Sequence, residues 1–125
     1  MKRAIKVDEA AALVPDGSAV LIGGFMGVGS PHRLIDALID RGVKDLTVIA
    51  NDCGKPGYGI GKLITAGAVS HLVASHIGLN PEAQKKMMSG EITVDLVPQG
   101  TLVERIRAGG VGLGGILTEI GRAHV

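Results

Sequence analysis

The residues best placed to do chemistry form a glycine-rich segment, Gly23-Gly-Phe-Met-Gly-Val-Gly29. An apolar run over residues 18–22 precedes this segment. Ser30-Pro31 follows it as a helix-start signal, with serine as the expected N-cap and proline at the first helical position. Strand, glycine turn and helix start together present backbone N–H groups and the positive end of a helix to an anion. The segment therefore indicates either a loop that binds a phosphate or thioester, or a tight structural turn.

Two common nucleotide-binding motifs do not fit the sequence. The dinucleotide fingerprint G-x-G-x-x-G fails because Gly27-Val-Gly29 is followed three residues later by His32. A Walker A loop ending at Gly61-Lys62 fails because Pro56 stands at its first position and Leu63 at its last. Nucleotide hydrolysis is therefore unsupported.

Further polar residues follow apolar runs that we expect to be strands. Asn51 and Asp52 end the second run and either make a turn or line a site. His76 ends the third run and is either a structural histidine with satisfied hydrogen bonds or a substrate contact. Gln99 follows the fourth run and either caps a helix or hydrogen-bonds the carboxylate of an acid substrate. Open parallel sheets bind ligands beyond the carboxyl ends of their strands, which is where we expect all four residues.

Two single residues in or near the loops have simpler interpretations. Phe25 is the only phenylalanine of the chain, and it either anchors its loop in the core or contacts a ligand or partner. Cys53 has no base near it in the sequence, so we interpret it as a small structural residue and not as a nucleophile.

Alternating strand and helix patterns must position these residues. We expect strands at residues 18–22, 46–50, 69–75 and 93–97 and helices at residues 7–13, 31–41, 61–66, 81–89 and 99–108. This alternation predicts an α/β fold with an open, mostly parallel sheet and flanking helices, in a single domain over residues 1–125. With one Phe, one Tyr and no Trp, the core must be aliphatic. No internal repeat is evident.

Composition argues against several classes of protein. A net charge of +1 gives no electrostatic footprint for nucleic acid. One cysteine cannot form an intrachain disulfide or a cysteine-based metal cluster. The longest apolar stretch, residues 19–28, is broken by glycines and is far shorter than the ~20 residues of a membrane helix. No signal peptide is recognisable, so we expect a cytoplasmic protein without metal, nucleic acid or membrane partners.

From Asp16 to Pro31 the sequence satisfies D-G-x-x-[apolar]3-G-G-F-x-x-x-G-x-P, which resembles the α-subunit signature of the family I (3-oxoacid or acetate–acetoacetate) CoA-transferases. Further segments similar to this family lie at residues 46–52, 59–64, 74–81, 98–107 and 108–115. The resemblance extends over nearly the whole chain up to Thr118, and it points to the bacterial acetate/acetoacetate or butyrate–acetoacetate enzymes.

The resemblance implies the CoA-transferase fold and an enzyme that moves CoA between a short-chain acyl-CoA (acetyl-, acetoacetyl- or butyryl-CoA) and a carboxylic acid. Acyl anhydride and enzyme-glutamyl-CoA thioester intermediates carry the reaction in such enzymes. CoA is then a substrate, and no covalently bound cofactor is expected. The residues that the resemblance assigns to CoA binding are Gly23, Gly24, Phe25, Met26, Gly27, Val28 and Gly29. Asn51, His76 and Gln99 are weaker candidates to line the substrate site.

The resemblance places the catalytic glutamate on a β subunit, in a Ser-Glu-Asn-Gly type motif. This sequence lacks the motif, because Ser89 is followed by Gly90-Glu91-Ile92, so we expect no catalytic residue here. The implied partner is a β subunit in a cytoplasmic hetero-oligomer, an αβ pair or its doubled α2β2 form. Lys85, Lys86, Arg105 and Arg107 are typical of solvated helix faces, with contact to the CoA phosphates as the alternative.

The sequence departs from the family pattern at its C-terminus. Family α subunits continue well beyond this length, and Arg122-Ala-His-Val125 does not match the expected continuation. We therefore expect the N-terminal portion of the family domain, truncated at the C-terminus. A non-catalytic relative that binds CoA or another ligand, and an inactive fragment, are the alternative interpretations.

Overall fold

The computed structural model describes residues 3–118 of the chain. Its elements in chain order are α1 (Val7–Ala12), β1 (Ala19–Ile22), α2 (His32–Asp40), β2 (Leu46–Asp52), α3 (Gly61–Thr65), β3 (Val69–His76), α4 (Pro81–Met88), β4 (Thr93–Leu96) and α5 (Gln99–Gly110). The order and type of these elements confirm the prediction from hydrophobic periodicity.

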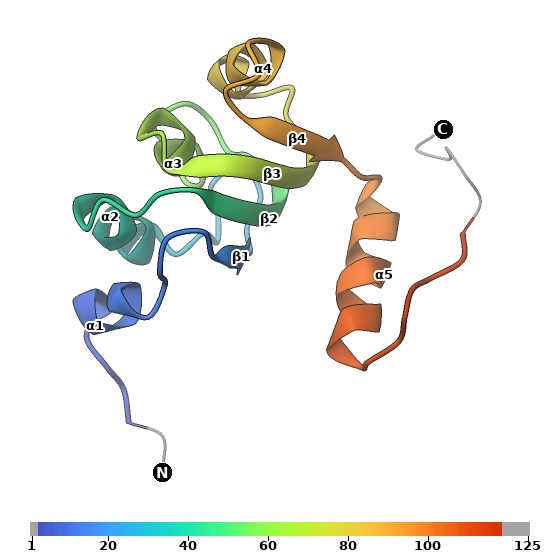
Figure 1. Ribbon diagram of the computed structural model, residues 1–125, viewed down its shortest axis with the longest axis horizontal. Coiled ribbons are helices and arrows are strands. Elements are labelled where there is room, and N and C mark those ends of the chain that lie inside the picture. The colour runs from blue at the N-terminus through green and yellow to red at the C-terminus, as the bar shows by residue number, and fades with distance from the viewer. Residues whose placement is uncertain (1–2, 119–125) are drawn as a thin grey trace.

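The four strands form one parallel sheet in the order β1-β2-β3-β4. Each step from one strand to the next moves in the same direction, and βαβ crossovers are almost always right-handed, so α2, α3 and α4 fall on one face of the sheet. Figure 1 shows α1 to α4 gathered on one side and α5 alone on the other. The predicted open, parallel α/β architecture is confirmed.

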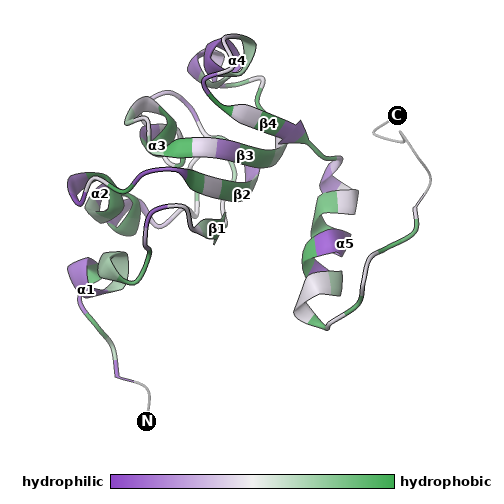
Figure 2. Ribbon diagram, in the orientation of Figure 1, coloured by the Kyte–Doolittle hydropathy of each residue, from purple (hydrophilic) through white to green (hydrophobic). Residues whose placement is uncertain are grey.

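The core lies between the sheet and this group of helices. Leu46, Val48, Leu63 and Leu72 are fully buried there and pack with Ile35 of α2. Figure 2 shows green, hydrophobic bands along the strands. The buried hydrophobic residues are aliphatic apart from Cys53, which confirms the predicted aliphatic core.

The opposite face of the sheet is only partly covered. Leu21 on β1 is exposed, and Ile49 and Val73 beside it on β2 and β3 are half-buried. Helix α5 packs over the carboxyl half of this face through the buried Leu102, and a cavity of about 220 Å³ remains between helix and sheet.

The start of α2 differs from the prediction. Pro31, and not Ser30, occupies the N-cap position, and no side chain caps the helix. The Ser30 hydroxyl instead donates to the Gly23 carbonyl oxygen at 3.2 Å. The predicted Ser30 cap is therefore wrong, because the loop that precedes the helix takes its hydroxyl.

The second strand is longer than predicted. Asn51 and Asp52 belong to β2, because the ladder with β3 continues to the pair Asp52 and His76. The predicted Asn80 cap of α4 is present, since its side-chain oxygen accepts the Ala83 N–H at 3.1 Å.

Candidate functional site

Two similar glycine loops lie at the carboxyl edge of the sheet. The first glycine loop (residues 23–29) follows β1, and the second glycine loop (residues 53–59) follows β2. Both contain G-x-x-G-x-G, at 24–29 and 54–59, and each is closed by one antiparallel bridge, between Phe25 and Val28 or between Lys55 and Tyr58. The expectation of no internal repeat is therefore wrong for this six-residue loop motif, which occurs twice.

The shared glycines all lie at positive φ in both loops. All six have positive φ: Gly24, Gly27, Gly29, Gly54, Gly57 and Gly59. L-residues with a side chain rarely adopt this region. The backbone shape of the loop therefore requires glycine at these three positions. The same spacing occurs in both loops, although the residues between the glycines differ.

The loops also pack against each other. A Cβ atom on Gly59 would lie 2.7 Å from Cα of Gly27, and a Cβ atom on Gly27 would lie 2.4 Å from ring carbons of Tyr58. Real Cβ atoms do not approach other atoms so closely, so Gly27 and Gly59 are needed for contact as well as for conformation. The two loops form one connected surface, which we call the glycine platform.

A buried carboxylate joins the two loops. Asp52 is 3% exposed, and its Oδ2 accepts the Gly54 N–H at 2.8 Å and the Met26 N–H at 3.1 Å. Of the two interpretations of Asp52, turn-making and site-lining, this geometry supports the first, because the bond to Gly54 two residues on is an Asx-turn. The bond to Met26 spans 26 residues of sequence, and sequence reasoning missed it.

His32 supports the first glycine loop from the start of α2. Its Nε2 lies 2.8 Å from the Gly27 carbonyl oxygen, to which the Nε2–H tautomer donates. Its ring lies against Tyr58 of the second loop, with the ring centroids 4.8 Å apart. His32 therefore contacts both loops, and the sequence pattern singled it out only for excluding a dinucleotide motif.

The platform presents apolar side chains at its surface, and several of its N–H groups have no acceptor among the described residues. Phe25 is 56% exposed, so the interpretation of Phe25 as a core anchor is wrong. Val28 and Tyr58 are exposed beside it. Within residues 3–118, the N–H groups of Phe25 and Val28 bond across the loop, whereas those of Gly24 and Gly29 have no acceptor. These two N–H groups can bind an anion or a polarised carbonyl oxygen.

A second polar cluster lies next to the platform. Gln99, the first residue of α5, donates through Nε2 to Oδ1 of Asn51 at 2.5 Å, and Ser75 Oγ donates to the Asn51 carbonyl oxygen at 2.6 Å. Asn51 and Gln99 line the 220 Å³ cavity, whose other walls include Leu21 and Ile49. The structure therefore brings Asn51 and Gln99 together. Gln99 does not cap its helix, because no side chain caps α5.

His76 stands apart from this cluster. It is exposed at the end of β3, and its ring lies against Gly78, where an added Cβ would be 2.6 Å from Cε1. Within the described residues its side chain has no hydrogen-bond partner, so the interpretation of His76 as a structural histidine with satisfied hydrogen bonds is wrong, and a substrate contact stays a prediction.

Cys53 begins the second glycine loop as a buried residue with 1% exposure. Burial, and secondarily the charge of Asp52, raises the pKa of its thiol to about 11. A thiol with this pKa is protonated at neutral pH, which agrees with a structural role and argues against a nucleophilic one.

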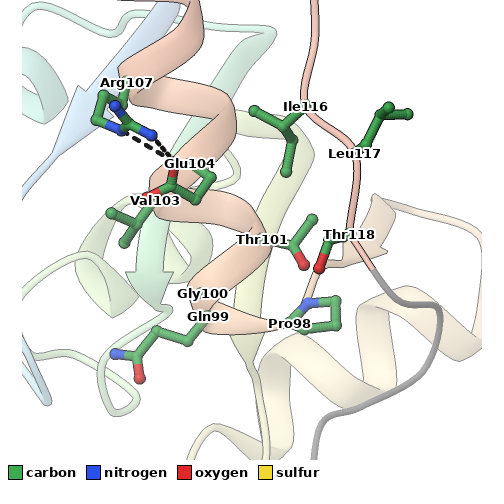
Figure 3. Close-up of a pocket in the computed structure, with 10 residues that line it drawn as sticks. All are labelled: Pro98, Gln99, Gly100, Thr101, Val103, Glu104, Arg107, Ile116, Leu117 and Thr118. Atoms are coloured by element: carbon green, nitrogen blue, oxygen red, sulfur yellow. Dashed lines mark hydrogen bonds and ion pairs between the residues drawn. The ribbon is translucent and has the colours of Figure 1, made fainter.

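A larger cavity lies elsewhere. It measures about 980 Å³ and lies between the first turns of α5 and residues 116–118 (Figure 3). Its charged residues, Glu104 and Arg107, pair with each other, and Leu117 is fully exposed to solvent. Figure 3 shows Gln99 directed to the opposite side of α5 from Ile116 and Leu117. Because no buried polar group points into this cavity, we place the candidate site at the glycine platform.

The remaining charged candidates lie on helices α4 and α5. Lys86 pairs with Glu91 at 2.7 Å, and Arg107 pairs with Glu104, whereas Lys85 and Arg105 are exposed. These positions are typical of solvated helix faces. Residues 3–118 contain no group of three or more His, Cys, Asp or Glu side chains placed to hold a metal ion. In the same range no helix combines the length and the hydropathy that a bilayer crossing requires.

Comparison with known proteins supplies the remaining evidence. Residues 4–123 match the coenzyme A transferase family. The chain is 59% identical, over 120 residues, to a probable coenzyme A transferase subunit alpha of Bacillus subtilis, covering 96% of this chain and 52% of that protein. It is 54% identical to the acetate CoA-transferase subunit alpha of Escherichia coli K12, covering 92% of this chain and 52% of that protein. The chain thus spans about half the length of the curated relatives it matches.

Solved structures share the fold. An acyl-CoA transferase of Escherichia coli O157:H7, in its thioester complex with CoA, superposes with a TM-score of 0.81 at 26% identity, covering 94% of this chain and 25% of that one. The decarboxylase AibA/AibB superposes with a TM-score of 0.74 at 28% identity, covering 89% of this chain and 44% of that one. Because this fold occurs in both a transferase and a decarboxylase, the fold alone does not decide the reaction.

Proposed function

This chain belongs to the coenzyme A transferase family, and on that premise we propose that it provides the α-subunit part of an enzyme that moves CoA between a short-chain acyl-CoA and a carboxylic acid. Relatives that share more than half of their aligned residues with it are named as alpha subunits of such transferases. The expected donors are acetyl-, acetoacetyl- or butyryl-CoA, and the partner is a β subunit in a cytoplasmic assembly, an αβ pair or α2β2.

The glycine platform carries this proposal. Residues 23–29 supply part of the CoA site, because the N–H groups of Gly24 and Gly29 are unpaired within the described chain and the exposed Phe25 and Val28 stand beside them. Fixed backbone N–H groups stabilise negative charge on a thioester oxygen without reorganising during the reaction. CoA is a substrate here, and no covalently bound cofactor is involved.

The amide pair next to the platform suits the acid substrate. Asn51 and Gln99 provide amide groups in the lining of the 220 Å³ cavity, and the apolar walls of this cavity fit a short acyl chain. His76, exposed at the same edge of the sheet, is the third residue proposed to line this site. Hydrogen bonds from amides to a carboxylate would orient the acid, while the aliphatic walls would exclude water from its chain.

The described chain offers no nucleophile to this site. Each of its glutamates is engaged elsewhere: Glu9 caps α1, Glu82 accepts from Thr65, Glu91 pairs with Lys86 and Glu104 pairs with Arg107. The Cys53 thiol is buried and protonated at neutral pH. We therefore place the catalytic glutamate, which forms the enzyme–CoA thioester, on the β subunit.

CoA transfer from acetoacetyl-CoA to acetate tests the proposal. This chain is mixed with the cognate β subunit, and a full-length α subunit of the same family serves as the positive control. We expect turnover by the mixture and none by either polypeptide alone. If the control pair is active and the mixture only binds CoA, this chain is a non-catalytic ligand-binding relative. Neither binding nor turnover beside an active control would indicate an inactive fragment.

A further inference from the structure

Asp52 is a buried carboxylate whose partners are hydrogen-bond donors without charge. Within residues 3–118 no ion pair includes it, and it is only 3% exposed. Its oxygens accept the N–H groups of Met26 and Gly54, and a weaker bond of 3.4 Å comes from Nδ2 of Asn51. A buried charge is tolerated only when such bonds satisfy it, so the backbone of both glycine loops is required around this side chain.

Met26 has a backbone conformation that is unfavourable for a residue with a side chain. Its φ is +52°, and only one other non-glycine residue of the described chain, Asp45, has positive φ. A residue with a side chain holds this conformation only when its surroundings fix it. The N–H group of Met26 points at both Asp52 oxygens, at 3.2 Å and 3.1 Å. The carboxylate is therefore the group that holds Met26 in its strained conformation.

We propose that Asp52 is the positioning residue of the glycine platform: its carboxylate fixes both loops and thereby sets the affinity for the CoA part of the substrate. The first half of this statement rests on the geometry alone, and the second half rests on the proposed function. Asp52 does not touch the expected substrate, since it lies beneath the loops.

The hydrogen bonds to Asp52 explain why residue 52 is a carboxylate, because both side-chain oxygens act as acceptors. Oδ2 serves Gly54 and Met26 together, while Oδ1 faces Met26 and the amide of Asn51. An asparagine keeps one acceptor but places an NH2 group against the N–H of Met26 or the amide of Asn51, so two donors face each other. An alanine leaves both loop N–H groups without an acceptor.

The test compares Asp52→Asn and Asp52→Ala with a matched control, Asp16→Asn. Oδ1 of Asp16 also accepts a backbone N–H from a distant residue, Lys44 at 3.0 Å, but at the opposite edge of the sheet. The first readout is amide hydrogen exchange in the chain by itself, which needs no substrate. We expect exchange at Met26 and Gly54 to accelerate at least about tenfold in both Asp52 variants and to stay unchanged in Asp16→Asn.

The second readout is the KM for acetoacetyl-CoA in the assembly with the β subunit. We expect Asp52→Asn to raise this KM about tenfold, with little change in kcat and a smaller rise in the KM for acetate, whose proposed site includes Asn51. Glycine adopts positive φ freely, so adding Met26→Gly to Asp52→Asn should restore most of the loss. The Met26→Gly single variant shows what the lost side chain contributes.

The outcomes separate the two halves of the proposal. Unchanged exchange at Met26 and Gly54 in Asp52→Ala would overturn the positioning role, whatever happens to CoA. Faster exchange with an unchanged KM for acetoacetyl-CoA would overturn the link to substrate affinity. Equal losses in both KM values and kcat, without rescue by Met26→Gly, would reduce Asp52 to a general stabilising residue and so contradict the proposal. If the wild-type assembly binds no CoA, the proposed function fails, and the exchange data still decide the positioning role.

Discussion

At the residue scale, the platform depends on positions where a side chain cannot fit. A Cβ atom added to Gly59 would lie 2.7 Å from Cα of Gly27 across the two loops, and the φ angles of Gly27 and Gly59, +86° and +58°, belong to the left-handed region. Gly57 has a similar φ of +66°, but an added Cβ there would meet nothing within 4 Å. Gly57 is thus needed for its conformation alone, whereas Gly27 and Gly59 are needed for both conformation and contact between the loops.

The pair Gly59→Ala and Gly57→Ala separates these needs. Both substitutions force alanine into positive φ, which costs about 1–2 kcal/mol. Gly59→Ala also places its Cβ 2.7 Å from Gly27, and such overpacking costs about 1–3 kcal/mol more. Urea unfolding should therefore give a larger loss of unfolding free energy for Gly59→Ala. Equal losses for the two variants would show that the loops do not pack against each other in solution.

The buried Cys53 makes a prediction about pH. Its thiol pKa is raised from 9.0 to about 11, so the unfolded chain releases this proton at lower pH than the folded chain. The contribution of the thiol to stability is complete below about pH 9 and is lost as the pH rises to about 11. Relative to Cys53→Ala, the wild-type chain should lose about 2–3 kcal/mol of unfolding free energy across this range.

Urea unfolding of both proteins at several pH values measures this difference. In the native state at pH 7, the thiol should also react with a disulfide reagent far more slowly than in urea. A constant stability difference from pH 8 to pH 11, or rapid native-state labelling, would contradict the buried and protonated thiol.

At the element scale, the chain uses one unit twice in succession. β1 with the first glycine loop and α2 is followed by β2 with the second glycine loop and α3. Parallel strands place both loops at the same edge of the sheet, where they meet. Strands and helices follow from local periodicity, so the sequence predicts them well. Ser30 shows the limit of local reasoning. Serine is a residue type that commonly caps helices, but its hydroxyl donates to the carbonyl oxygen of Gly23 in the preceding loop and does not cap α2.

Helix α1 offers a test of how the elements are held together. It has only six residues, too few to be stable by itself, and Arg41 at the C-terminal end of α2 donates to the carbonyl oxygens of Ala11 and Val14 at its end. Arg41→Ala should lower the free energy of unfolding by about 1–2 kcal/mol. It should also accelerate amide exchange in residues 10–14. Arg33→Ala, an exposed position on α2, should change stability by less than about 0.5 kcal/mol. Similar effects of the two variants would show that Arg41 does not stabilise α1 through these hydrogen bonds.

At the scale of the whole molecule, the sequence predicted the parallel sheet, its aliphatic core and the edge that carries the candidate site. It named Asn51 and Gln99 as candidates to line the substrate site, which stays a prediction, and the structure joins the two across 48 residues by a hydrogen bond. The bond between Asp52 and Met26 and the contact between Gly27 and Gly59 were not predicted, because each depends on how two loops meet after the sheet has formed. Of the two interpretations of Phe25, the core anchor was wrong, because hydropathy favours burial and does not show how a loop places its side chains.

The central claim is that CoA is bound at the glycine platform and not at the larger cavity beside α5. The most direct test is NMR of this chain, labelled with 15N-glycine, in the assembly with the β subunit, recorded as CoA is added. We predict that the amide signals of Gly24 and Gly29 shift most, with smaller shifts at Gly57 and Gly59 and none at Gly100. Shifts centred on Gly100, in the wall of the 980 Å³ cavity, with the loop glycines unchanged, would contradict the account.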